Sequence, residues 1–244
     1  MNRISALVLI PALLACGVGT ASAQPVTSPN SHVGVAIKLS TLGIGVDAAV
    51  PVHDRVNIRG GFSALSLNHD FDTDGITLAA QLKLRSVSTY LDWFPFGGGF
   101  HVSPGVMLYN GNEMSAVASV PGGKKFSLGD ESLVSNPANP VTGNAAVGFE
   151  KVAPAILIGW GNLVPRGQRR WSIPFEIGIV YSRAPIATLT LGGSACNQNG
   201  ANCRNIASDA TLQADLATQQ RNINSDISPL KALPVVSLGF SYKF

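Results

Sequence analysis

The last nine residues of the chain read Val236-Ser237-Leu238-Gly239-Phe240-Ser241-Tyr242-Lys243-Phe244. Large apolar side chains occupy every second position, and small or polar residues fill the positions between them. Such alternation is typical of a β-strand that has one apolar face and one polar face. The stretch therefore predicts a terminal strand whose two faces meet different surroundings.

The same period of two recurs through most of the chain. It is clearest in residues 33–39, 42–50, 55–63, 76–93, 100–109 and 171–182. Within 76–93 the apolar residues change phase, which we interpret as a β-bulge. A second phase change, at Ser40-Thr41, is interpreted as a tight turn, with a bulge as the alternative. With the turn, counting backward from the terminus predicts eight strands, and an even number suits a bacterial outer-membrane barrel.

The segments between the expected strands alternate in length. Residues 50–54, 94–99 and 162–170 predict short turns, and residues 68–75, 120–144 and 191–231 predict longer loops. Short turns on one side and long loops on the other are typical of outer-membrane barrels. Nine aromatic residues lie beside the short turns or at the C-terminus: Trp93, Phe94, Phe96, Phe100, Trp160, Trp171, Phe240, Tyr242 and Phe244. They predict an interfacial girdle, with the core of a soluble β-sandwich as the alternative. The predicted fold class is an all-β, closed antiparallel transmembrane β-barrel of eight strands.

The composition of the 244-residue chain agrees with this fold. Hydrophobic residues make up 45% and charged residues 13%, the formal net charge is +3, and the mean hydropathy is +0.24. A disordered chain would be less hydrophobic and more charged. A nucleic-acid partner would need a dense basic patch, so we expect none.

The first residues predict a secretory signal peptide. Met1-Asn2-Arg3 is positively charged, residues 4–15 are almost wholly apolar, and Ala21-Ser22-Ala23 forms a cleavage site. The alternatives are a membrane anchor and lipoprotein processing at Cys16. We expect residues 1–23 to be removed and residues 24–244 to form a single barrel domain in the bacterial outer membrane.

The C-terminal stretch resembles the β-signal of outer-membrane proteins. In that signal a polar residue is followed by a glycine and then by two aromatic residues, and Gly239, Tyr242 and Phe244 occupy the glycine and aromatic positions. The resemblance implies that the barrel-assembly machinery is a partner during insertion. It also implies contact with outer-membrane lipid and lipopolysaccharide afterwards.

Further stretches resemble a family of small Gram-negative outer-membrane β-barrel proteins of uncertain function. They are residues 41–46, 57–61, 82–86, 91–100, 109–112, 153–154, 159–162 and 212–216. The resemblance implies a fold and a location, and it implies no catalytic residues.

Charged residues on the polar faces of the strands are expected to point into the lumen. An eight-stranded barrel has room inside for little more than its own side chains, and buried charges must be paired. We therefore predict a lumenal charge network in which Glu176 lies near Arg59, Lys83 and Arg85, and a permeation path is the alternative. The predicted members are Lys38, Asp47, Arg59, Lys83, Arg85, Asp92, Glu176 and Lys243, and His101 is expected to point inward as well.

The last long loop, residues 191–231, contains two further features. Cys196 and Cys203 predict a disulfide, since cysteines of exported proteins are commonly oxidised. Ser208 is expected to cap a helix that has Asp209 in its first turn and that Pro229 ends. Its apolar stripe consists of Leu212, Leu216, Ile223 and Ile227. We expect this helix to pack over the barrel mouth or near the lipid head groups, with partner binding as the alternative.

The sequence contains little that points to catalysis. Some outer-membrane lipid A deacylases use a His and a Ser on a strand that faces the lipid, as His101 and Ser103 could. Here both residues belong to the polar, lumenal face of their strand, and the flanking residues do not match those enzymes. Residues 70–75 resemble a calcium loop that lacks the bidentate glutamate. We predict no catalytic residue, cofactor or metal site. The leading hypothesis is a non-enzymatic structural or surface-interaction role, and the alternatives are a lipid-modifying enzyme and a narrow channel. The oligomeric state stays open.

Overall fold

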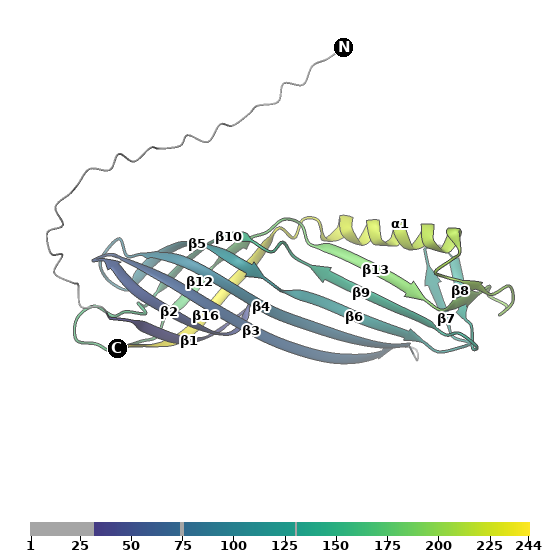
Figure 1. Cartoon of the computed structure of the whole chain (residues 1–244), viewed down its shortest axis with the longest axis horizontal. Helices are drawn as coiled ribbons and strands as arrows, with labels where there is room; N and C mark the ends of the chain where they lie inside the picture. The colour runs from purple at the N-terminus through teal and green to yellow at the C-terminus, as the bar shows by residue number, and fades with distance from the viewer. Residues whose placement is uncertain (1–31, 74–75, 130) are drawn as a thin grey trace, which may run out of the picture. The chain divides into compact units, whose positions relative to one another are not determined.

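The computed structural model describes residues 32–73, 76–129 and 131–244. The predicted signal peptide lies outside these residues. Within the described part of the chain, eight antiparallel strands close into a barrel (Figure 1). They are β1 (Gly34–Ser40), β2 (Gly43–His53), β3 (Val56–Thr73), β4 (Ile76–Trp93), β5 (Phe100–Asn110), β10 (Ala153–Trp160), β12 (Phe175–Tyr181) and β16 (Ala232–Lys243).

Backbone pairing runs around the whole barrel. The strands follow one another in the order β4-β3-β2-β1-β16-β12-β10-β5, and β5 pairs with β4 to close the circle. The short β11 (Trp171–Ser172) extends the pairing along β16 beside β12. Because every barrel strand pairs with two neighbours, the barrel has no free strand edge. The backbone hydrogen-bonding groups of such an edge could not be satisfied by lipid. The predicted fold class is confirmed.

The first two strands form the predicted hairpin. β1 pairs with β2 from Gly34↔Ala49 to Ser40↔Gly43, so the chain turns at Thr41 and Leu42. The alternative of one bulged strand is therefore wrong. At the opposite end of the barrel, Gly34 pairs with Lys243, next to the C-terminus. The short turns 54–55 and 94–99 lie at this same end, and we call it the short-turn end.

The outer surface of the barrel is apolar. Along β2, Ile44, Val46 and Val50 are exposed, whereas Asp47 and Ala49, which point the other way, are buried. Large aromatic side chains are exposed near the short-turn end, among them Trp93, Phe96, Trp160, Trp171 and Phe244. An apolar outside bordered by aromatic residues is the surface that a lipid bilayer requires.

Two barrel strands continue well past the barrel and start a second structure, which we call the extension. β3 and β4 pair without a register shift over their full 18 residues each. Beyond the barrel, β6 (Glu113–Val120), β9 (Val141–Gly148) and β13 (Ile186–Gly192) continue the sheet in the order β3-β4-β6-β9-β13. Residues 68–73 and much of 120–144, which were expected to be loop, are strand.

A small sheet and a helix complete the extension. The small sheet contains β7 (Lys125–Leu128), β8 (Glu131–Ser135), β14 (Ser194–Cys196) and β15 (Arg204–Asn205). The helix α1 (Ala210–Ile227) lies along β13, as Figure 1 shows. Its N-cap is Asp209, which accepts a hydrogen bond from the Leu212 amide, and this corrects the expected cap at Ser208. In the described part of the chain, no helix has the length and hydropathy needed to cross a membrane.

A register shift does occur beside the phase change in residues 76–93, between Val87 and Ser88 in the pairing of β4 with β5, but the extra residue is Leu108 of β5 and the phase change has another cause. β4 pairs with β3 without interruption, so its even-numbered residues all point to the side of the lumen. In the barrel that side is polar, with Ser86, Ser88 and Asp92 buried. In the extension the same side is apolar, with Leu78 and Leu82. The strand is regular, and the polarity of its two faces exchanges where the chain leaves the barrel.

Candidate functional site

The lumen contains a cluster of charges centred on Arg59. This guanidinium, from β3, is 1% exposed. It donates to Glu176 of β12 at 2.5 and 2.9 Å, to Asp92 of β4 at 2.9 to 3.2 Å, and to Asp47 of β2 at 3.1 Å. The central carbon of the Arg59 guanidinium lies 4.7 Å from the centre of the Tyr90 ring. One arginine thus joins three carboxylates from three strands that are far apart in the sequence.

Two further side chains balance these carboxylates. Lys38 Nζ lies 2.7 and 2.9 Å from the two oxygens of Asp47, and His101 Nε2 lies 3.1 Å from Glu176 Oε1. Three carboxylates are therefore matched by two cations and one imidazole. Gly61 leaves room for this arrangement, because a Cβ atom there would overlap the Asp47 carboxylate.

Hydroxyl groups occupy remaining acceptor positions of the carboxylates. Ser103 Oγ donates to Asp92 at 2.7 Å, and Ser237 Oγ donates to Glu176 at 3.2 Å. Buried charges persist when their hydrogen-bonding positions are filled in this way. The cluster has the properties of a structural plug.

The structure brings together five of the eight residues of the predicted network. Lys38, Asp47, Arg59, Asp92 and Glu176 form the cluster described above. His101, which was expected to point inward, joins them. Sequence reasoning missed the parts played by Ser103, Ser237 and Tyr90, whose only signal is their place on the inward faces of alternating strands.

The other three predicted members lie elsewhere. Lys83 and Arg85 face away from the lumen, because β4 pairs with β3 without a register shift and its odd-numbered residues point outward. Their expected proximity to Glu176 is therefore wrong. Lys243 does point inward, but its Nζ donates to the carbonyl oxygens of Pro165 and Gly167 at 2.6 and 2.8 Å.

The loop that Lys243 holds closes the short-turn end of the barrel. Leu163 and Val164 are buried and pack against Ala36 and Ala49. The Asn57 side chain donates to Asn162 Oδ1 at 2.8 Å and fixes the start of the loop. This stretch, expected as a simple turn, is a plug under the charge cluster.

An apolar layer fills the lumen above the charge cluster. Its side chains come from β4, β5, β10, β12 and β16 and from the β1–β2 turn, and they pack in one buried cluster. Its members include Leu42, Met107, Leu157, Val180 and Val235. The lumen is therefore occupied at three levels, by the loop, by the charges and by this layer.

His101 and Ser103 do not form a lipid-facing catalytic pair. Both are buried in the lumen, where they contact Glu176 and Asp92. In the described residues, no three His, Cys, Asp or Glu side chains group so as to hold a metal ion. Asp70 and Asp72 lie within strand β3 rather than in a loop, and residues 74–75 are outside the described part.

The extension has its own apolar core on the face continuous with the lumen, which we call the inner face. Leu212 and Leu216 of α1 are buried against residues of β6, β9 and β13. Residues from the small sheet, among them Leu133 and Ala195, belong to the same cluster. The expected position of the helix over the barrel mouth or at the head groups is therefore corrected: it packs against the extension.

α1 also covers the free edge of β13. The Asn224 side chain accepts from the Ala187 amide at 2.8 Å and donates to the Ala187 carbonyl at 3.1 Å, and Gln220 accepts from the Leu189 amide at 3.1 Å. An unpaired strand edge invites unwanted pairing with other chains. Here two amide side chains take the place of a neighbouring strand.

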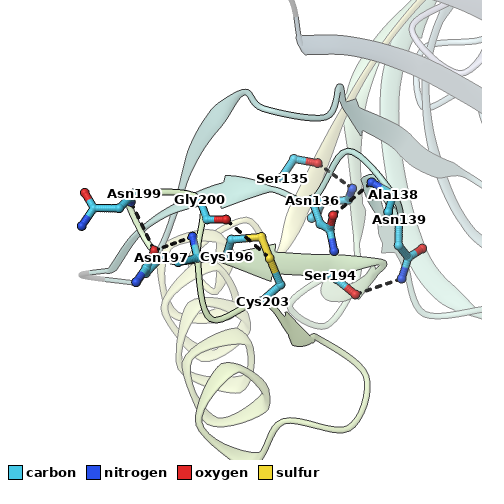
Figure 2. The surroundings of a disulfide bond; sticks show 12 residues. Ser135, Asn136, Ala138, Asn139, Ser194, Cys196, Asn197, Asn199, Gly200 and Cys203 are labelled. Atoms are coloured by element: carbon cyan, nitrogen blue, oxygen red, sulfur yellow. Dashed lines mark hydrogen bonds between the residues drawn. A yellow bond between two sulfur atoms is a disulfide. The ribbon is translucent and has the colours of Figure 1, made fainter.

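A disulfide joins Cys196 and Cys203 beside the small sheet, as Figure 2 shows. The six residues between them form a turn in which Asn197 Oδ1 accepts from the Asn199 and Ala201 amides. β14, which contains Cys196, pairs with β8 and β15. The bond thus ties a turn to the end of the extension.

Part of the inner face is left uncovered. Leu67 of β3, Leu82 of β4 and Met114 of β6 form one row across three strands, and Phe71 and Leu78 begin the next row. Leu67, Phe71, Leu78 and Met114 are 52%, 47%, 37% and 54% exposed. The opposite face of β3 carries Ser66, Asn68, Asp70 and Asp72. We call the uncovered rows the apolar patch.

Comparisons with known proteins add to this picture. No family model matches the chain, and no curated protein matches it. Among solved structures, Acinetobacter baumannii CarO is similar, with a TM-score of 0.54 and 20% sequence identity over 86% of this chain and 97% of that chain. Acinetobacter baumannii CarO2 gives a TM-score of 0.56 and 20% identity over 88% of this chain and 99% of that chain. The chain is therefore similar in fold, over most of its length, to these two proteins.

Proposed function

We propose that this protein resides in the bacterial outer membrane with its lumen closed. We further propose that it acts, without catalysing a reaction, through the extension on the cell surface, where the apolar patch holds an amphiphilic molecule. The observation that carries the proposal is the patch itself. Large contiguous apolar areas that face water commonly mark interaction sites.

The surroundings of the patch favour an amphiphile. The same inner face is covered by α1 and the small sheet at β9, at β13 and at the Val120 end of β6. Burial is therefore the rule for this face, and the rows that run from β3 and β4 to Met114 of β6 are the exception. Polar groups stand close by: the His69 ring lies 4.5 Å from the Phe71 ring. A ligand with an apolar body and a polar end can contact both the apolar patch and the polar groups beside it.

The orientation follows from the ends of the strands. The C-terminus and the short turns share one end of the barrel, and the extension stands at the other. Short turns face the periplasm in outer-membrane barrels and long connections face outward. This arrangement supports an extension, with its patch, on the outside of the cell.

Site-specific photocrosslinking tests the proposed role. A benzophenone amino acid is placed at Phe71, on the patch, and in a control at Asn68, on the opposite face of the same strand. After irradiation of intact cells, we expect an adduct of small mass at position 71 and none at 68. Equal adducts at both positions, or none at either, would contradict the proposal. A protein-sized adduct confined to position 71 would replace the amphiphile with a protein partner.

Two simpler measurements test the location and the closed lumen. Protein extracted from purified outer membranes should migrate differently in SDS gels before and after boiling, because a closed barrel resists SDS when cold. In planar bilayers the folded protein should be silent. Steady conductance would support the narrow-channel alternative.

A further inference from the structure

The periplasmic rim of the barrel carries a group of arginines beside a groove. The loop that closes the barrel contains Arg166, Arg169 and Arg170, and Arg55 lies in the turn between β2 and β3. A groove of about 370 Å³ is lined by Arg166 and Arg169, by the glycines of the turn 97–99, and by Trp171 and Ile173. None of these groups takes part in the lumenal cluster or in the apolar patch.

The groove combines cationic and apolar walls. Trp171 and Ile173 are 56% and 57% exposed and belong to the outer, lipid-facing side of the barrel. Nearby, the ring of Phe100 lies 4.9 Å from the ring of Trp160. A molecule in this groove would meet guanidinium groups at the level of the turns and aromatic and aliphatic side chains on the membrane side.

Arg166 is exposed at the rim, but protein covers one side of its guanidinium. Its guanidinium lies 4.9 Å from the ring of Phe94. Partial burial lowers its pKa, the nearby Arg55 acts in the same direction, and Asp54 acts against them. A partly desolvated guanidinium gains from an anion that supplies charge and hydrogen-bond acceptors together.

From these observations we infer that the groove binds the phosphate head group of an anionic phospholipid in the periplasmic leaflet. Arg166 and Arg169 face the phosphate, and the acyl chains lie over Ile173 and Trp171. Arginine matches phosphate geometry, and aromatic side chains favour the membrane interface. Asp54 is an acidic group beside Arg166. The assignment of this lipid to the periplasmic leaflet rests on the proposed location of the protein. Binding at the groove itself can be tested in detergent.

Native mass spectrometry of the delipidated full-length protein tests the inference. The probes are dioleoyl phosphatidylglycerol and, as the zwitterionic comparison, dioleoyl phosphatidylcholine. We expect preferential binding of one phosphatidylglycerol. In the R166Q/R169Q variant its affinity should fall about thirtyfold, which corresponds to about 2 kcal/mol for the loss of two arginines near an anionic lipid. Phosphatidylcholine binding should not change.

Three controls give each outcome a meaning. R221Q removes the same charge from the exposed side of α1, where Arg221 contacts Thr218, and should bind phosphatidylglycerol as the wild type does. R169Q alone, at an exposed position, replaces the double variant if the latter loses its heat-modifiable gel mobility. Millimolar inorganic phosphate should leave the lipid bound, because the apolar wall contributes to binding. Equal binding of both lipids, unchanged binding in R169Q, or displacement by inorganic phosphate would overturn the inference. The crosslinking result at Phe71 is independent of all three.

Discussion

The barrel and the extension share two strands but use them in opposite ways. In the barrel half of β3, Arg59 points inward into a polar cluster while Ile58 and Phe62 are exposed. In the extension half, Leu67 lies on the inner side while Asn68 and Asp70 are outside. The pairing register is continuous between the halves. The difference teaches that the solvent outside, lipid or water, decides which face of a strand must be apolar.

Arg59→Met tests the lumenal half of this comparison and should have the largest effect. It leaves Asp92, Glu176 and Asp47 without their shared cation, and breaking a buried ion pair costs about 3–5 kcal/mol. The free energy of unfolding in urea, measured by tryptophan fluorescence in lipid vesicles, should fall by that amount. The matched control is Arg85→Met, on the outer side of β4, which should change stability little. Equal losses in both variants would contradict the placement of Arg85.

Leu212→Ala tests the apolar core of the extension. Leu212 is fully buried, and truncation of a buried leucine costs about 3 kcal/mol. The loss should be local: α1 should exchange its amide hydrogens faster, while the gel mobility shift of the barrel on heating stays unchanged. Thr211→Ala, at the exposed neighbouring position, is the control. Loss of the mobility shift would show that barrel and extension do not fold as separable regions.

A lysine on the outer face should reveal where lipid gives way to water. Val87→Lys places a charge on the lipid-facing side of β4, six residues from Trp93, and such a charge costs about 2 kcal/mol away from the interfaces. Ala79→Lys makes the same kind of change on the same side of the same strand, but in the extension, where water is expected. Its cost should be close to zero in the same urea titration. Similar losses in the free energy of unfolding at both positions would contradict a boundary between lipid and water along β4.

Asn224→Ala should have the smallest of these effects. It removes the two hydrogen bonds to Ala187 at the part-buried edge of β13, each worth about 0.5 kcal/mol because water can replace the lost partner. Asn222→Ala, on the exposed side of α1, is the control. We expect faster amide exchange at Ala187 in the first variant alone. Unchanged amide exchange at Ala187 would show that water satisfies the backbone groups of this strand edge as well as Asn224 does.

Several features of the fold could be predicted because they depend on local pattern. The period of two marked the strands, and the phase change at Ser40-Thr41 marked the hairpin turn that the structure contains. Pro229 marked the end of α1 correctly, whereas its start was misplaced by one residue, because Ser208 and Asp209 are both good capping residues. The long connections were harder, since polar residues on a strand that faces water resemble loop residues.

The members of the lumenal cluster were only partly predictable. Arg59 and Glu176 are 117 positions apart, and their contact depends on how β3 and β12 face each other across the closed barrel. Lys83 and Arg85 were assigned inward because a polar residue in a barrel strand points to the lumen. That reasoning fails beyond the membrane, where the polar face is the outer one.

By itself, the sequence determined that the chain forms alternating strands with an apolar side, and it marked the turns, the cysteine pair and the helix, because each depends on neighbouring residues. Only the tertiary structure decided which side of each strand faces the interior, which charges meet in the lumen, and which part of the inner face stays uncovered. The physical reason is that alternation specifies two faces but not their surroundings. Those surroundings, lipid, water or protein, exist only once the barrel has closed.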